Sequence, residues 1–308
     1  MRRCALAVLM LLAAAGACGS SAPAPTPPPA PDGARAFQHL EAQVACGPRV
    51  PGSAAAACCR RYILAHLERR AEKLGLQEFR LADPYGTDSL QLVNILAHFH
   101  PERPARVLLA AHYDSRPRAD RDSGAAQSLP VPGANDGASG VAVLLEVAEA
   151  LGSWDPGVGV DLVFFDGEDY GKEGEVQHYL LGSRHFAATM GAYRPRAMLL
   201  LDMVGDADLH IRMEENSLRA APALTRLVFA VAESLGAKSF VSAPGPAVYD
   251  DHMHFLLQRI PAVDLIDLDY PAWHTTRDLP AACSPASLEE VARVVLHVLQ
   301  RLGRGSGA

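Results

Sequence analysis

Short apolar runs recur along this chain and alternate with longer segments in which apolar residues return every three or four positions. The runs predict strands over residues 91–99, 106–111, 160–165, 197–201 and 262–268. The longer segments predict helices over 54–74, 137–151, 182–190, 222–235 and 287–302. Such alternation predicts a three-layer α/β/α sandwich whose central sheet is mixed but mostly parallel. The first two strands are expected to pair as antiparallel neighbours.

Acids and histidines follow several of these strands. The strand 160–165 leads into a loop with three carboxylates, Asp166, Glu168 and Asp169, which is a costly arrangement unless a cation lies nearby. Further candidates follow other strands or lie between them: His112, Asp114, Asp136, Asp202 and His274. Each alone reads as an ordinary turn or cap residue. Together, at the sheet edge where α/β folds bind ligands, they have the imidazole and carboxylate chemistry of a catalytic zinc site.

These residues resemble, in type and in order along the chain, the zinc-dependent aminopeptidase family that also contains the animal-type glutaminyl cyclases. The residues that carry the resemblance are His112, Asp114, Asp136, Glu168, Asp169, Asp202 and His274, and it extends over about residues 37–302. The resemblance implies a zinc exopeptidase-like fold. Three segments resemble the cyclases more than the peptidases: the paired aspartates and histidine of Tyr249-Asp250-Asp251-His252, the tryptophan before His274, and residues 182–187. Peptidases of the family usually show serine-aspartate-histidine and tyrosine-histidine at the first two places.

The resemblance implies one zinc ion bound by Asp136, Asp169 and His274. Glu168 would shuttle a proton, with a pKa nearer neutrality than that of a free glutamate if it is buried among acids. Asp202 and Asp250 would hydrogen-bond around it. The expected reaction converts the N-terminal glutamine of peptides or proteins to pyroglutamate and releases ammonia. The resemblance also implies a cis peptide bond after Asp136.

Aromatic residues near the candidate ligands are expected to form the walls of a substrate pocket. Trp273 would offer a flat apolar surface to the glutamine side chain, and Tyr270 and Tyr170 are further candidates. For these two tyrosines, packing in the core is an equally good interpretation. The long loop over residues 113–135 is expected to form a rim of the site, the alternative being a surface insertion.

The sequence departs from the family pattern at two positions, and two other functions stay open. Asp169 stands where relatives carry glutamate, and Asp264 stands where animal cyclases carry a histidine. In a two-zinc aminopeptidase, His112 and Asp202 would bind a second metal, Asp136 would bridge the pair, and Glu168 would activate a water molecule. A metal-free binding domain of the same fold is the third interpretation.

Composition narrows the class of protein. The chain has 308 residues, 49% of them hydrophobic, which suits one globular domain with a large core. Its formal net charge of -7 argues against nucleic acid as a partner. We expect a monomer. Beyond residue 18 the chain has four cysteines: Cys46, Cys58, Cys59 and Cys283. A bridge from Cys46 to Cys58 or Cys59 and buried free thiols are both open.

The first residues predict export. Residues 1–17 read as a secretory signal followed by Cys18, which predicts a lipoprotein anchored to the membrane through a lipid at Cys18, in the periplasm or on its bounding membrane. The alternative is an ordinary signal peptide cut nearby. Residues 18–36, rich in proline and alanine, read as a tether, 37–302 as the zinc-dependent catalytic domain and 303–308 as a tail. No later apolar run is suited to span a bilayer.

Overall fold

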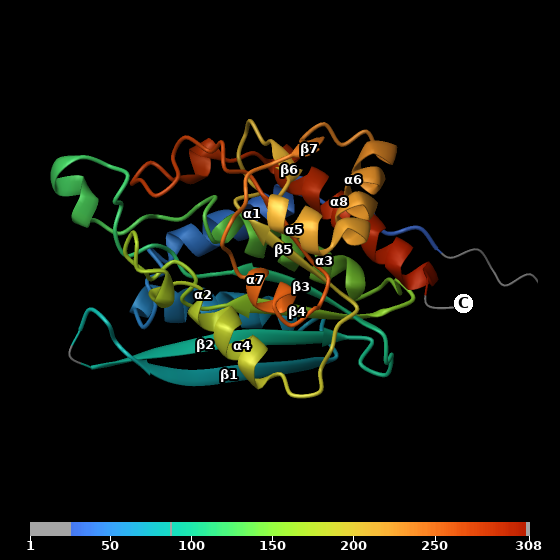
Figure 1. Cartoon of the computed structure of the whole chain (residues 1–308), viewed down its shortest axis with the longest axis horizontal. Helices are drawn as coiled ribbons and strands as arrows, with labels where there is room; N and C mark the ends of the chain where they lie inside the picture. The colour runs from blue at the N-terminus through green and yellow to red at the C-terminus, as the bar shows by residue number, and fades with distance from the viewer. Residues whose placement is uncertain (1–25, 87, 306–308) are drawn as a thin grey trace, which may run out of the picture.

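A six-stranded mixed sheet forms the centre of the computed structural model, which describes residues 26–86 and 88–305 (Figure 1). Its strand order is β1-β2-β4-β3-β5-β8. β4, β3, β5 and β8 are parallel, and β1 and β2 add two antiparallel pairings at one edge. The strands are β1 (Lys73–Ala82), β2 (Ser89–Phe99), β3 (Arg106–His112), β4 (Gly159–Phe165), β5 (Ala197–Asp202) and β8 (Ala262–Ile266).

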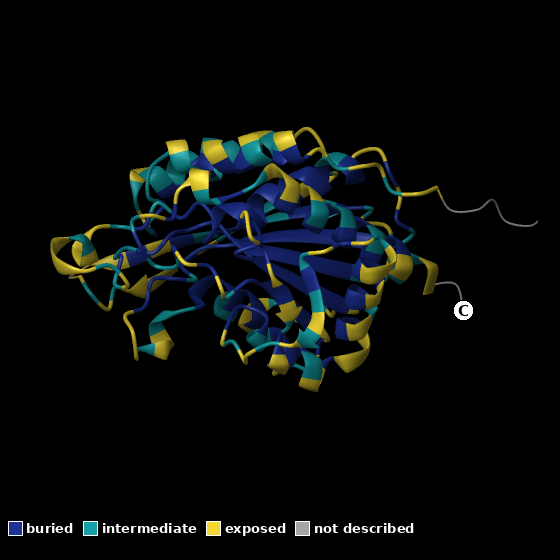
Figure 2. Cartoon of the chain, turned by 90° about the horizontal axis from the view of Figure 1, so that it is seen from above, coloured by how far each residue is buried: buried dark blue, intermediate teal, exposed yellow. Residues whose placement is uncertain are grey.

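Helices cover both faces of this sheet, which confirms the predicted α/β/α class (Figure 2). One layer contains α1 (Gly33–Ala45), α2 (Ala54–Leu67), α3 (Ala138–Leu151), α6 (Pro222–Ser234) and α8 (Pro285–Arg304). The other contains α4 (Leu181–Thr189) and α7 (Met253–Leu256). α5 (Glu215–Ala220) contacts β8, and β6 (Ile211–Met213) pairs with β7 (Phe240–Pro244) in a small parallel sheet. Single 3-10 turns occur at Gly124–Ser128, Val176–His178 and Pro280–Ala282.

The strands of the sheet are apolar on both faces because both are covered. On β3, Leu109 and Ala111 pack in the larger core under α3 and α8, whereas Leu108 and Ala110 face the smaller core with Phe186 of α4. Continuous apolar runs are typical of strands buried in this way. The same burial explains why the sequence pattern identified these central strands.

Two predictions about the edge of the sheet are wrong. The helix predicted over 54–74 ends at Leu67, because Lys73–Ala82 forms β1 and pairs with β2 along its whole length. β1 is largely exposed, so its helix-forming residues carry little apolar pattern, and the pairing decides its conformation. The strands β2 and β3 are not neighbours either. The fully buried β4 lies between them and pairs with both.

The first described residues and the cysteines bear on other predictions. The carbonyl of Thr26 accepts hydrogen bonds from Trp154 and Gln300, and α1 begins at Gly33, within the range predicted as tether. Cys46 and Cys58 form a disulfide, which selects one of the open cysteine pairings. Cys59 and Cys283 are buried free thiols.

The predicted signal segment and Cys18 lie outside the described residues. Within residues 26–86 and 88–305, no helix combines the length and the apolar character that a bilayer crossing needs.

Candidate active site

The carboxyl ends of the parallel strands meet around a cavity of about 120 Å³. β3 ends at His112 and β5 at Asp202, while β4 leads directly into the loop with Glu168 and Asp169. Seven predicted site residues line this cavity: Asp136, Glu168, Asp169, Asp202, Asp250, Trp273 and His274. The fold therefore brings together residues that lie up to 138 positions apart in the sequence.

Asp136, Asp169 and His274 form a group with the geometry of a metal site. Nε2 of His274 lies 3.4 Å from Oδ2 of Asp169 and 3.7 Å from Oδ2 of Asp136. Ligands of a tetrahedral zinc ion with bonds of about 2.0 Å are about 3.3 Å apart. Oδ2 of Asp169 is buried and has no hydrogen-bond partner in the described part of the chain. A buried carboxylate oxygen without a hydrogen-bond partner can be satisfied by a bound cation, so the three residues fit a zinc ion.

The other ring nitrogen of His274 faces a carboxylate. Nδ1 lies 3.6 Å from Oδ1 of Asp120, which belongs to the predicted rim loop. The backbone of His274 has a φ of 56°, an uncommon conformation for a residue with a side chain, and its carbonyl accepts a hydrogen bond from the amide of Arg121. The rim loop thus holds this histidine from two directions.

Asp169 is held by an arginine. The guanidinium of Arg116, which is 1% exposed, donates to Oδ1 of Asp169, to Oδ2 of Asp120 at 2.5 Å and to the hydroxyl of Tyr179 at 2.9 Å. This contact occupies one oxygen of Asp169 and leaves the other facing His274. Burial raises the pKa of Asp169 to about 6, against the opposing effect of His274 and Arg116.

The backbone around Asp136 is fixed by a distant carboxylate. Asp278 accepts from the amide of Asn135 at 2.8 Å and from the amide of Asp136 at 3.1 Å. The predicted cis peptide bond after Asp136 is wrong, since the described residues contain none. The turn is made instead by Gly137, whose φ is 98° and whose position would bring a Cβ within 2.3 Å of the Asp114 carbonyl oxygen.

Asp114 organises the acidic loop. Its two carboxylate oxygens accept from the amides of Glu168 at 3.0 Å and Asp169 at 3.2 Å. The carboxylate of Glu168 then faces the cavity, 4.0 Å from Nδ1 of His112. Burial and the adjacent Asp169 raise the pKa of Glu168 well above its usual value, in the predicted direction. The third acid of the loop, Asp166, turns away and accepts from the hydroxyl of Tyr113.

A second group with ligand chemistry lies beside the first and shares Asp136. Nε2 of His112 is 3.1 Å from Oδ1 of Asp202 and 3.3 Å from Oδ1 of Asp136. These are the residues predicted to hold a second metal in the aminopeptidase alternative.

A model of the family described as "Peptidase family M28" matches residues 94–299, about two thirds of the chain. This chain belongs to peptidase family M28.

Solved structures and curated relatives agree with this membership. A Zn-dependent exopeptidase from Parabacteroides distasonis has a TM-score of 0.84 and 37% identity, over 88% of this chain and 99% of that one. Porphyromonas gingivalis glutaminyl cyclase has a TM-score of 0.84 and 34% identity, over 89% and 99%. The glutaminyl-peptide cyclotransferase-like protein of Bos taurus is 28% identical over 80% of this chain and 70% of its own length. The zinc exopeptidase-like fold is therefore confirmed.

In the segment Asp250-Asp251-His252, Asp250 lines the cavity of this M28 protein, whereas His252 is buried and does not line it. Asp250 lines the cavity, and burial and the nearby Asp202 raise its pKa well above the usual value. His252 is fully buried, with Nε2 3.3 Å from Glu214 and Nδ1 3.6 Å from Asp264. Asp264 therefore faces His252 beneath the site, and it is not among the residues that line the cavity.

The aromatic residues divide differently from the prediction. Trp273 lines the cavity, and the guanidinium of Arg121 lies 4.7 Å from its ring centroid. Tyr270 does not line it. Its hydroxyl donates to Asp278 at 2.7 Å and the residue is 4% exposed, which favours the alternative interpretation of packing in the core; a role as a wall of the pocket stays a prediction. Tyr170 packs in a separate apolar cluster, and its hydroxyl donates a hydrogen bond to Asp83. Two other tyrosines, Tyr179 and Tyr249, line the cavity in their place.

Proposed function

We propose that this M28 protein is a zinc-dependent glutaminyl-peptide cyclotransferase, which converts N-terminal glutamine to pyroglutamate and releases ammonia. One observation carries the proposal: the cavity joins the ligand group Asp136, Asp169 and His274 to the carboxylate of Glu168 and the ring of Trp273. The similarity to bacterial glutaminyl cyclases over most of the chain supports the same activity.

Asp136, Asp169 and His274 would hold the zinc ion, and the unpartnered Oδ2 of Asp169 supports this assignment. When bound, zinc supplies Lewis-acid polarisation of the side-chain carbonyl oxygen of the substrate glutamine. The contacts of Arg116 and Asp120 hold two of the ligands in place before metal or substrate arrives. Such prior orientation is what a metal site needs from its surroundings.

Glu168 moves the proton in this proposal. The α-nitrogen of the substrate attacks the δ-carbon of its own side chain, a new C–N bond closes the ring, and the bond to the amide nitrogen breaks. Glu168 takes a proton from the attacking amine and delivers it to the departing nitrogen, so that ammonia leaves and no water is consumed. Its raised pKa suits a group that accepts and returns a proton near neutral pH.

Asp202 and Asp250 would hydrogen-bond around Glu168 and the departing nitrogen. Both line the cavity beside Glu168, and carboxyl groups form strong hydrogen bonds with nitrogen donors. Trp273 would form the apolar wall against the methylene groups of the glutamine side chain. Holding amine and amide together in this way exploits the high effective concentration of an intramolecular reaction.

A two-zinc aminopeptidase is the second candidate, because the group His112, Asp136 and Asp202 is also assembled. The two activities are separated by substrate. The cyclotransferase releases ammonia from glutaminyl peptides and leaves leucyl and alanyl p-nitroanilides intact, whereas an aminopeptidase hydrolyses the anilides. Anilide hydrolysis without ammonia release would replace our proposal by the second candidate.

We further propose that the protein acts after export, as a monomer anchored to the membrane only through a lipid on Cys18. The leader and the Ala- and Pro-rich residues after it support this proposal, as does the Cys46–Cys58 disulfide, which suits an oxidising compartment. Peptides and proteins with N-terminal glutamine that are present there would be the substrates. Mass spectrometry of the mature N-terminus, searching for an acylated Cys18, tests the anchor.

A further inference from the structure

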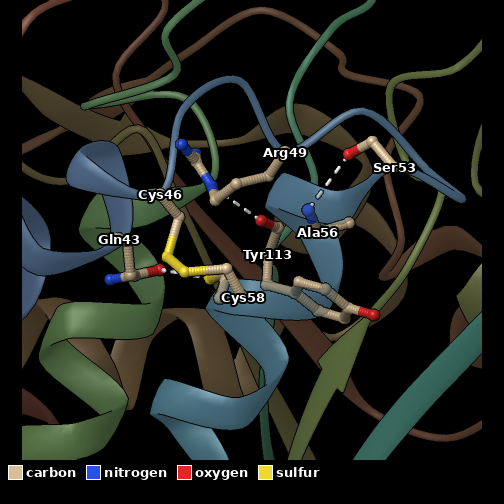
Figure 3. Close-up of a disulfide and its surroundings, with 8 residues drawn as sticks. Gln43, Cys46, Arg49, Ser53, Ala56, Cys58 and Tyr113 are labelled. Atoms are coloured by element: carbon tan, nitrogen blue, oxygen red, sulfur yellow. Dashed lines mark hydrogen bonds between the residues drawn. A yellow bond between two sulfur atoms is a disulfide. The ribbon is translucent and has the colours of Figure 1, made fainter.

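The segment between α1 and α2 is closed by the Cys46–Cys58 disulfide and carries a buried arginine (Figure 3). Arg49 lies near the middle of this segment and is 0% exposed. Burying a guanidinium is costly unless its donors are satisfied, so its partners indicate what it does. They belong to two segments far away in the sequence.

Arg49 donates only to backbone carbonyl oxygens among its described side-chain hydrogen bonds. Nε reaches the carbonyl of Tyr113 at 2.9 Å, Nη1 that of Pro132 at 2.7 Å and Nη2 that of Gly133 at 2.5 Å. The backbone of Arg49 is held as well, since its amide donates to Oγ of Ser115 and its carbonyl accepts from the Ser115 amide. One side chain therefore ties the segment after β3 to the loop before α3.

These are the two segments that carry candidate ligands. Tyr113 lies between His112 and Asp114, and Gly133 lies three residues before Asp136. Arg49 satisfies carbonyl oxygens at the start of this loop, while Asp278 satisfies the amides of Asn135 and Asp136 at its end. The contact leaves little room for adjustment, because a Cβ on Gly133 would lie 2.7 Å from Nη2 of Arg49 and also 2.7 Å from the Asp136 carbonyl oxygen.

We propose that Arg49 is a positioning residue for the metal centre, and that the Cys46–Cys58 disulfide fixes the segment that carries it. The inference rests on the zinc site proposed above. Arg49 holds the backbone of the segment 112–114 and of the Asp136 loop at a set separation, and Asp114 in turn accepts from the amide of Asp169, so Asp136 and Asp169 are in place before the metal binds. Opening the disulfide frees one constraint on Arg49 and weakens zinc binding, which makes the centre sensitive to thiol oxidation state.

Zinc affinity, measured by competition with a chromogenic chelator, tests the role of Arg49 directly. Arg49→Met should bind zinc about 10- to 100-fold more weakly than the wild type, the range seen when groups that orient metal ligands are removed. Arg49→Lys, which keeps the charge and can reach fewer carbonyls, should fall between the two. The melting temperature of each metal-free variant reports folding separately, and Arg49→Lys carries the test should Arg49→Met not fold.

Arg106 provides a matched control at the other end of β3. Its guanidinium also donates to backbone carbonyls, those of Phe99, His100 and Val160, besides its ion pair with Asp161. Arg106→Met should lower the melting temperature and leave zinc affinity unchanged. Equal losses of zinc affinity in the Arg49 and Arg106 variants, or wild-type affinity in the Arg49 variants, would overturn the inference. A wild-type protein that binds no zinc would overturn the metal site itself.

The disulfide is tested by the double variant Cys46→Ser/Cys58→Ser, since thiol reductants themselves bind zinc. It should bind zinc about tenfold more weakly in the wild-type background and change little further in the Arg49→Met background, because both changes act through one contact. Zinc affinity equal to that of the wild type in the double variant, or full additivity of the two losses, would overturn the role given to the disulfide.

Discussion

Oδ1 of Asp120 lies 3.6 Å from Nδ1 of His274, on the side of the ring opposite the nitrogen that faces Asp169 and Asp136. A carboxylate in this place orients the ring and favours the tautomer whose Nε2 lone pair is free for a metal. The rim loop therefore serves the metal site, because it orients one of the candidate ligands.

The first prediction concerns this contact. Asp120→Asn should weaken zinc binding about 10-fold or more, since the neutral amide orients the imidazole less strongly. Asp122→Asn is the matched control. Asp122 accepts from the amide and hydroxyl of Thr276 in the same segment without contacting the His274 ring. Chelator competition on both variants measures the difference, and similar affinities in the two would contradict the assignment.

Glu168 should be needed for turnover and dispensable for metal binding. Glu168→Gln keeps the shape of the side chain and removes its ability to accept a proton, so kcat should fall about 10²- to 10⁴-fold. Zinc content should stay at the wild-type level. Glu173→Gln should retain activity, because Glu173 lines a second pocket next to the cavity and not the cavity itself. Full ammonia release by Glu168→Gln would remove this residue from the mechanism.

Trp273 and Tyr270 should respond in opposite ways to substitution. Trp273→Leu removes a wall of the cavity and should raise KM for glutaminyl peptides with little effect on the melting temperature. Tyr270→Phe removes the hydrogen bond to the buried Asp278 and should lower the free energy of unfolding by about 1–3 kcal/mol with KM nearly unchanged. Steady-state kinetics and urea denaturation of both variants check the pair. A raised KM in Tyr270→Phe would instead support its predicted wall role.

Asp166 should make the metal-free protein less stable as pH rises. Burial and Asp114 raise the pKa of this carboxyl to about 7 in the folded protein, against about 3.9 in an unfolded chain. The folded state therefore keeps a proton that the unfolded state has lost, and the resulting stability is present below pH 4 and is lost as pH rises through 7. Between pH 5 and 8 the wild type should lose about 2–3 kcal/mol more than Asp166→Asn. Equal losses by urea denaturation would contradict this origin.

The sequence predicted the central strands and the candidate ligands well for one reason. β3, β4 and β5 are buried on both faces, so they are apolar throughout, and the polar residues at their ends stand out. His112, Glu168 and Asp202 were identified on that basis. The edge strand β1 lacks this signal because most of its residues are exposed, and its formation depends on pairing with β2.

Except for Asp114, the residues that hold the ligands were not predicted. Arg49 and Asp278 act on backbone groups of segments more than 60 residues away, and such contacts leave no periodic pattern in the sequence. Asp120 and Arg116 lay in a loop identified only by its length. The hydrogen bond from Tyr270 to Asp278 could not be predicted either. In the sequence alone, an aromatic residue near a candidate ligand is equally consistent with a pocket wall and with packing in the core.

A zinc titration of the metal-free protein tests the central claim most directly, with ammonia release from a glutaminyl peptide and hydrolysis of leucyl p-nitroanilide followed together. We predict that ammonia release reaches its maximum at one zinc ion per chain, with no anilide hydrolysis at any zinc concentration. Activity that appears only with a second zinc ion and acts on the anilide would contradict the account.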